Sequence, residues 1–311
     1  MKKRDLLSIA DLLPKEIQGL LNRAIEMKKG AQSQCLAEKS VAMLFEKPSL
    51  RTRVSFDVAV HQLGGHAIYL GRDEVGLGNR EGVSDVGRVL SRYVDAIVAR
   101  TYSHQTLEAL ASYATIPVVN ALSDAEHPCQ TLGDLLTIQE RRTGGRLKGL
   151  TIAFIGDGNN VAASLALGAA AVGVHFVIAS PPGYELPEDI VRQAKSIAPA
   201  MNATLRQVRD PKEAARQADV VYTDVWVSMG QESQGDQRRR DFQGYQVTPE
   251  LMALASPKAV FMHPLPAHHG EEVADGMLEH PQSVVFDQAE NRLHIQKAVL
   301  ELLLGGPREL K

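Results

Sequence analysis

Short apolar runs alternate with longer helical patterns along this chain, and they do so in two successive series. Nearly continuous apolar runs separated by helices are typical of parallel sheets that helices cover on both faces. The runs predict strands at residues 41–45, 67–70, 96–99 and 117–120, and then at 151–155, 175–178, 219–223, 259–262 and 284–286. Helical patterns near 51–63, 82–92, 104–114 and 128–142 accompany the first series.

Two series imply two domains, and the chain length agrees. At roughly 150 residues per domain, 311 residues suggest two. The polar segment 140–149 marks the boundary, because its glycines suit a helix C-cap. We predict an α/β fold with two domains, each a parallel sheet flanked by helices, over residues 1–142 and 143–288. The last helical pattern, within 289–311, is expected to pack back on the first domain.

Composition excludes several classes of protein. A formal net charge of −3 provides no basic field for nucleic acid or for an anionic membrane. The most apolar stretch, 161–174, is shorter than the ~20 residues that span a bilayer. Cys35 and Cys129 are too few for a disulfide scaffold or a thiolate zinc site. We therefore expect a cytoplasmic protein without a metal, acting on a small polar partner.

The first predicted strand is followed by Ser-Leu-Arg-Thr-Arg at 49–53, which begins a helix. Ser49 is a natural N-cap, and the free backbone N–H groups of a first helical turn bind anions. Arg51 would oppose the helix dipole there unless an anion were bound. Surface arginines that pair with nearby carboxylates are an equally good interpretation of this motif alone.

Two further strands of the first series end on polar residues. Arg100 follows 96–99, and His127 precedes Pro128 and Gln130 after 117–120. A residue before proline is held extended, so the His127 ring is not committed to the helix. A lone histidine is more often structural. Three strand ends that supply anion donors and a neutral hydrogen-bond donor instead predict a site for a phosphate joined to a carbonyl.

The second series offers groups that suit an amino acid. Gly-Asp-Gly-Asn-Asn at 156–160 resembles half of a dinucleotide fingerprint, but Val161 replaces the third glycine and no acid follows the next strand. Asn160 and its neighbour are better interpreted as neutral groups that meet a carboxylate. Asp224, beside the single tryptophan, could hold an ammonium or merely cap a turn. The backbone carbonyls of the His-Pro-Leu-Pro turn at 263–266 could accept from an amide.

The polar segment 230–244, which contains Arg238, Arg239 and Arg240, is the longest predicted irregular loop. A solvated loop is the simpler interpretation. Long loops in compact domains are also often lids, so a lid remains the alternative.

These motifs, in this order, resemble the aspartate/ornithine carbamoyltransferase family, and specifically its ornithine branch. The segments that carry the resemblance are 45–53, Arg100, 127–130, 156–160, 224–230, 263–266 and 291–294. The resemblance implies an anabolic enzyme that transfers the carbamoyl group of carbamoyl phosphate to L-ornithine, giving citrulline and phosphate. It also implies a homotrimer that needs no cofactor and no metal.

The resemblance also assigns residues. Arg51, Arg100, His127 and Asp224 would be catalytic. Ornithine would meet Asn160, Asp224, Ser228 and Met229. Carbamoyl phosphate would be bound by Ser49, Leu50, Arg51, Thr52, Arg100, His127, Pro128, Cys129, Gln130, Pro264, Leu265 and Arg292.

Three positions depart from the family pattern. Leu50 replaces the more frequent threonine, which preserves a backbone contact but removes a hydroxyl. Gly76 stands where many members place a glutamine that reaches into the neighbouring subunit. Pro264 replaces the cysteine of the ornithine branch, as in the aspartate branch, and we expect retained activity with altered ornithine affinity or pH dependence.

Other functions remain open at this point. Pro264 suggests transfer to another amine or to an acylated ornithine. An NAD-dependent oxidoreductase would fit the sheets but not Val161. A non-catalytic member of the fold is the third alternative, against which the intact polar residues argue.

Overall fold

The computed structural model describes residues 3–305 except 79, 142 and 229. The chain divides into two compact units, which are Met1–Leu136 with Glu290–Lys311 and Thr137–Ala289. We call them unit 1 and unit 2. The division lies inside two helices, a few residues from the predicted boundaries at 142/143 and 288/289.

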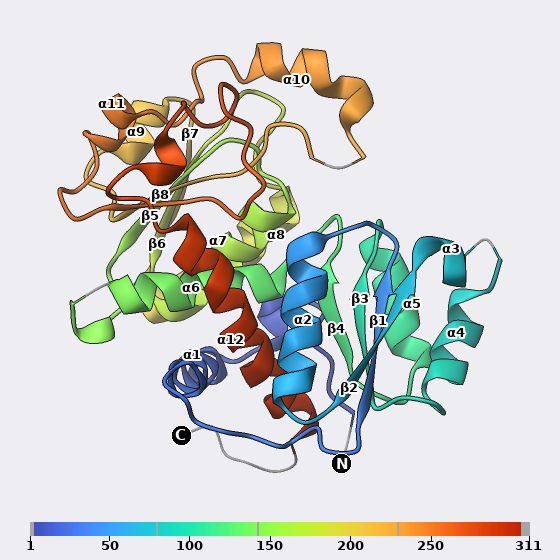
Figure 1. Cartoon of the computed structure of the whole chain (residues 1–311). Coiled ribbons are helices and arrows are strands. Elements are labelled where there is room, and N and C mark those ends of the chain that lie inside the picture. Colours follow the sequence, from blue (N-terminus) through green and yellow to red (C-terminus); the bar gives the residue numbers. More distant parts are fainter. Residues whose placement is uncertain (1–2, 79, 142, 229, 306–311) are drawn as a thin grey trace. The chain divides into compact units, whose positions relative to one another are not determined.

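Unit 1 contains a parallel four-stranded sheet in the order β2-β1-β3-β4 (Figure 1). The four strands predicted for the first series are confirmed. Phe45, at the end of β1, pairs in register with Arg100 at the end of β3, so their following loops leave the same edge. The strands are β1 (Ser40–Phe45), β2 (His66–Gly71), β3 (Ala96–Arg100) and β4 (Val118–Leu122).

The helices of unit 1 cover this sheet, and those predicted from periodicity are present. Apolar side chains of α4 and α5 join the sheet residues in one core, which contains Val86, Ile97 and Leu107. The helices are η1 (Ile9–Asp11), α1 (Pro14–Lys28), α2 (Leu50–Gln62), α3 (Arg72–Val75), α4 (Val83–Leu90), α5 (His104–Tyr113) and α6 (Pro128–Arg141), which continues into unit 2.

The C-terminal helix α12 (Val285–Leu304) packs on unit 1 from Glu290 onward, as predicted. Glu301, 7% exposed, accepts from Arg23 of α1 through both carboxylate oxygens, at 2.6 and 3.1 Å. Lys297 donates to Gln62 of α2 at 2.9 Å. Figure 1 shows α2 and this part of α12 side by side.

Unit 2 contains a parallel five-stranded sheet in the order β7-β6-β5-β8-β9. Four of its strands match the prediction. The predicted strand at 284–286 is wrong, because α12 begins at Val285, which packs into the core of unit 2. The strands are β5 (Thr151–Ile155), β6 (His175–Ala179), β7 (Leu205–Val208), β8 (Val220–Thr223) and β9 (Val260–Met262).

Among the helices of unit 2, α7 is buried along its whole length except at Asn160. The segment 230–244 is not the irregular loop that we predicted, because much of it is helical and Arg238 is only 4% exposed. The helices are η2 (Thr143–Gly145), α7 (Asn160–Val172), α8 (Glu188–Met201), α9 (Pro211–Ala215), η3 (Glu232–Gln234), α10 (Gly235–Asp241), α11 (Pro249–Met252) and η4 (Met277–Glu279).

Across the described residues, none of the helices combines the length and the apolar character that crossing a membrane requires.

Candidate functional site

The N-terminus of α2 forms the base of a cationic cluster in unit 1. Ser49 is the N-cap, and its Oγ accepts from the Thr52 backbone N at 3.3 Å. Arg292 of α12 donates from Nη2 to the Thr52 hydroxyl at 2.7 Å. The bond fixes the Arg292 guanidinium beside the first turn of α2, where backbone N–H groups are available to an anion.

Arg51 and Arg100 complete this cluster. Arg100 is 5% exposed at the end of β3, and its Nε has no hydrogen-bond partner among the described residues. Burial lowers the pKa of Arg100 to about 10, and the positive charges of Arg292 and Arg51 add to the effect. Burial also lowers the pKa of Arg51. Like charges held together in a desolvated place favour binding of an anion.

His127 lies in the same electrostatic environment. It is 4% exposed, directly before α6. Burial, followed by the charges of Arg292 and Arg100, holds its pKa well below the ordinary histidine value. The imidazole is therefore neutral near pH 7 and suited to a neutral hydrogen bond.

Gln130 and Cys129 follow in the first turn of α6. The Gln130 amide donates to Asp134 Oδ1 at 2.9 Å, which leaves its buried Oε1 with no protein donor among the described residues. An amide NH₂ of a ligand would satisfy that oxygen. Burial raises the pKa of Cys129 to about 12, so it is a thiol with no nucleophilic character near pH 7.

Two departures from the family pattern have local explanations in unit 1. The Leu50 side chain is 75% exposed, so only its backbone belongs to the helix N-terminus. Gly76 ends α3 with φ 57°, and a Cβ there would approach the Arg80 Cβ to 2.8 Å. A glutamine at this position would strain the backbone.

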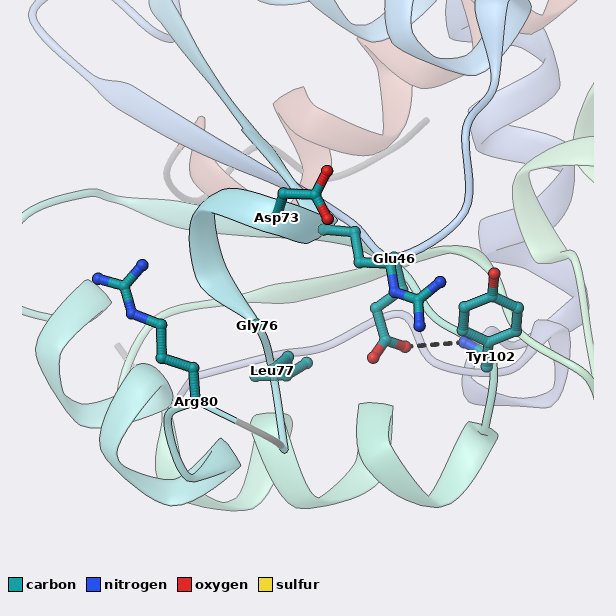
Figure 2. Close-up of a pocket in the computed structure, with 7 residues that line it drawn as sticks. Glu46, Asp73, Gly76, Leu77, Arg80 and Tyr102 are labelled. Atoms are coloured by element: carbon teal, nitrogen blue, oxygen red, sulfur yellow. Dashed lines mark hydrogen bonds between the residues drawn. The ribbon is translucent and has the colours of Figure 1, made fainter.

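Gly76 also lines a hollow that Figure 2 shows between α3 and the loop after β3. Glu46 and Tyr102 lie close together there, and Glu46 Oε2 accepts from the Tyr102 backbone N at 2.8 Å. Because both charge signs line this hollow, it lacks the purely positive character of the cluster at α2.

Unit 2 brings an amide and a carboxylate together at the ends of β5 and β8. Asn159 caps α7 by accepting from Val161 N and Ala162 N, and its Nδ2 donates to Asp224 Oδ2 at 2.8 Å. Burial raises the pKa of Asp224 even though this bond and the Val225 N–H oppose the shift. A buried carboxylate of this kind is stabilised by an ammonium ligand.

Sequence reasoning did not single out Asn159, whose bond to Asp224 joins residues 65 positions apart. Asn160, the residue predicted to meet ornithine, is the first residue of α7. Ser228 lies after Trp226, and its backbone N donates to Gln231 Oε1 at 3.2 Å. Met229, also predicted, lies outside the described residues.

Pro264 and Leu265 follow β9 in a turn that His263 organises. His263 Nδ1 accepts from Leu265 N at 2.9 Å, so its Nε2 carries the proton and donates to Glu272 Oε1 at 3.2 Å. Leu265 adopts φ 58°, and Pro264 is buried. Sequence reasoning missed Glu272, which has no nearby motif although it is fully buried.

Among the described residues, the group that could hold a metal is His268, Glu271 and Glu272. Glu271 already accepts from Arg239 at 2.8 Å, and Glu272 from His263. One oxygen of each carboxylate therefore already accepts from a protein donor.

The glycines of segment 156–160 serve packing. A Cβ on Gly158 would lie 2.4 Å from the Glu185 backbone, and its N–H donates to Tyr184 O at 2.8 Å. The chain therefore approaches itself closely here, which explains the half-match to a dinucleotide motif without a nucleotide.

Comparison with known proteins covers both units. The family model described as the carbamoyl-P binding domain of aspartate/ornithine carbamoyltransferase matches residues 4–140, and the one described as its Asp/Orn binding domain matches 148–303. A protein of Pyrococcus furiosus named anabolic ornithine carbamoyltransferase is 49% identical over 97% of both chains.

Solved structures agree with this family match. An ornithine carbamoyltransferase structure from Pyrococcus furiosus has a TM-score of 0.93 at 49% identity and covers 98% of both chains. An acetylornithine transcarbamylase complexed with acetylcitrulline has a TM-score of 0.87 at 30% identity, covering 97% of this chain and 99% of that one.

Two parallel-sheet units, one with a cationic cluster and the other with a carboxylate–amide pair, are the features of a two-substrate group transferase. The chain belongs to the aspartate/ornithine carbamoyltransferase family.

Proposed function

We propose that this protein transfers the carbamoyl group of carbamoyl phosphate to the δ-amine of L-ornithine, giving L-citrulline and phosphate for arginine biosynthesis. The observation that carries this proposal is the cluster of Arg51, Arg100 and Arg292 at the N-terminus of α2, in which burial, followed by the two like charges, lowers the pKa of Arg100. The near-full-length relatives named ornithine carbamoyltransferase support the choice of acceptor.

Carbamoyl phosphate is assigned to unit 1. The phosphate would occupy the arginine cluster together with the Ser49 and Thr52 hydroxyls and the N–H groups of the first turn, where the Leu50 contribution is its backbone. Arg100 and the neutral His127 ring would donate to the carbonyl oxygen as it gains negative charge. Gln130 Oε1 would accept from the carbamoyl NH₂, with Pro128 and Cys129 as the supporting backbone.

Ornithine is assigned to unit 2. Asp224, held by Asn159, would bind the α-ammonium, with Asn160, Ser228 and Met229 around the remaining groups. The δ-amine attacks the carbamoyl carbon through its lone pair, so it must be neutral at that moment. The C–O bond to phosphate then breaks, the attacking nitrogen gives up a proton to the departing phosphate, and the arginines hold the hydrogen phosphate dianion that leaves. The carbonyls of Pro264 and Leu265 would accept from the carbamoyl NH₂.

The test is a colorimetric citrulline assay on the purified protein with both substrates. We expect citrulline from L-ornithine, and we expect Asp224→Ala to raise KM for ornithine by roughly 100-fold, because an ammonium–carboxylate contact with hydrogen bonds contributes about 3 kcal/mol. Absence of citrulline contradicts the proposal, and unchanged ornithine kinetics in Asp224→Ala contradict the role of that residue.

A second candidate is carbamoyl transfer to another amine or to an acylated ornithine. Pro264, in place of the cysteine of the ornithine branch, is the observation that favours it. A substrate panel at fixed carbamoyl phosphate, assayed for phosphate release, separates the two, because fastest turnover with N-acetylornithine or another amine would refute L-ornithine as the substrate. Pro264→Cys tests whether the restored thiol changes ornithine affinity.

We also infer a cytoplasmic homotrimer. Cys35 and Cys129 are both unpaired, which suits a reducing compartment. Leu50 and Val54 lie one turn apart on α2 and are 75% and 50% exposed, which suits a surface that another subunit covers. Light scattering after gel filtration should give three times the 33.8 kDa chain mass, and the mass of one chain would contradict the trimer.

A further inference from the structure

Arg238 differs from the two arginines that follow it on α10. Its side chain is buried, whereas Arg239 and Arg240 are exposed. The guanidinium lies 4.7 Å from the ring centroid of Tyr184 and 5.5 Å from that of Phe242. Burial of an arginine is costly unless its donors are matched, so its partners indicate what it does.

Those partners belong to the loops after two different strands. Arg238 Nε donates to the backbone O of Trp226, and Nη2 donates to the Asp157 carboxylate. Asp157 lies in the loop after β5, and Trp226 lies in the loop after β8. One guanidinium thus ties α10 to both loops.

The same two loops carry the amide–carboxylate pair. Asp157 precedes Asn159 by two positions, and Trp226 follows Asp224 by two positions. The 2.8 Å bond between Asn159 and Asp224 is therefore two residues along the chain from each contact that Arg238 makes. If the bridge is removed, both loops lose a common anchor.

Charge gives Arg238 a second means of action. Burial raises the pKa of Asp157 to about 6 against the opposing effect of Arg238, and the negative charge of Asp224 raises it further. Asp157 and Asp224 are thus close enough to repel each other. Arg238 offsets this repulsion and leaves Asp224 as the carboxylate available to a cation.

We propose that Arg238 is a positioning residue for the amine substrate, which acts through Asp157 and the Trp226 carbonyl to hold Asn159 and Asp224 in their binding geometry. This inference rests on the proposed function and deepens it. Arg238 itself is not assigned a contact with substrate.

The experiment compares Arg238→Met with Arg240→Met, a matched control on the same helix whose guanidinium donates to Gln237 at the surface. Loss of hydrogen bonds to a charged partner predicts a rise in KM for ornithine of roughly 10- to 100-fold in Arg238→Met. KM for carbamoyl phosphate should stay within about twofold, and Arg240→Met should stay within about twofold in both constants.

Two further measurements distinguish positioning from a general loss of structure. The effects of Asp157→Asn and Arg238→Met on KM for ornithine should be non-additive in the double variant, because each substitution removes the same bridge. Trp226 is the only tryptophan, so its fluorescence reports directly on the loop that Arg238 holds. We expect a red-shifted emission in Arg238→Met and a smaller shift in Arg238→Lys, which keeps the charge but not the fork.

The inference is overturned if Arg238→Met and Arg238→Lys both leave KM for ornithine within about twofold of the wild type. Additive effects of the Arg238 and Asp157 substitutions would also overturn it. If Arg238→Met does not fold, Arg238→Lys carries the same comparison. A wild-type protein that makes no citrulline refutes the proposed function instead, which the first assay reveals before any variant is made.

Discussion

At the scale of single residues, Arg100 shows how a binding site conflicts with stability. Its pKa is lowered to about 10 because the folded protein buries the guanidinium beside two other arginines. We predict that Arg100→Met raises the free energy of unfolding of the ligand-free protein by about 1–3 kcal/mol, because a buried unmatched charge is replaced by an apolar side chain of similar size.

The same substitution should nearly abolish citrulline formation. Denaturant unfolding in phosphate-free buffer, with a circular dichroism readout, measures the first effect. A variant that is less stable than the wild type would show that Arg100 is matched by groups of the folded protein rather than reserved for an anion. Arg88→Met is the control, since Arg88 is exposed on α4.

At the same scale, we predict that the contribution of His127 to stability depends on pH. Its pKa in the folded protein lies below the ordinary 6.5, mainly because of burial. As pH falls below about 6.5, the unfolded chain takes up a proton on this residue that the folded chain does not. The His127 contribution to stability is therefore present above pH 6.5 and is lost as pH falls.

Unfolding free energies measured from pH 7.5 to 5.5 should fall less steeply in His127→Gln than in the wild type. His61→Gln, at an exposed position of α2, should keep the wild-type slope. In a histidine-labelled sample, the ring signals of His127 should not titrate over this range. Titration near pH 6.5 would contradict a buried neutral imidazole.

At the scale of elements, one buried carboxylate of α12 contributes to its docking on unit 1. Glu301 accepts from Arg23 and from the Ser33 hydroxyl at 2.5 Å, and it is 7% exposed. We predict that Glu301→Gln lowers the free energy of unfolding by about 2 kcal/mol, because the charged partner of Arg23 is lost in a mostly buried place. Chemical denaturation measures the change.

Glu26 offers a matched control, since it pairs with the same Arg23 at 2.9 Å but its side chain is 62% exposed. Glu26→Gln should change stability by less than about 1 kcal/mol. Equal effects of the two substitutions would mean that α12 is not held by the buried pair.

Elements also show where sequence reasoning succeeds and where it stops. Strands with a continuous apolar run, such as β1 and β5, were predictable because burial on both faces requires that run. β7 was missed because Arg206 and Gln207 are exposed on the sheet edge and interrupt the pattern. The apolar run at 284–286 was mistaken for a strand. It instead leads into α12, where Phe286 is 63% exposed.

Site residues divide in the same way. Ser49, Arg100 and His127 could be proposed as site residues because strand ends and helix starts have local signals. The roles of Asn159, Glu272 and Arg238 depend on partners 65, 9 and 81 positions away, respectively. No local pattern specifies such pairings, and three consecutive arginines resemble a solvated surface until the fold buries one of them.

At the scale of the whole molecule, the two units make separate contributions that ligands can report. A ligand that binds only the folded state stabilises it by an amount that grows with the logarithm of its concentration relative to Kd, about 2.7 kcal/mol at 100 times Kd. Inorganic phosphate should therefore raise Tm by itself, because it neutralises the repulsion among Arg51, Arg100 and Arg292. Arg100→Met should remove most of this rise.

The effect belongs to unit 1, so a substitution in unit 2 provides the comparison. Arg238→Met should retain the phosphate-dependent rise in Tm, since Arg238 lies in the other unit and holds the loops of the amine site. Sulfate and chloride at matched ionic strength separate specific binding from screening. If chloride raises Tm as much as phosphate does, the cationic cluster only repels itself and selects no anion, and its assignment to carbamoyl phosphate fails.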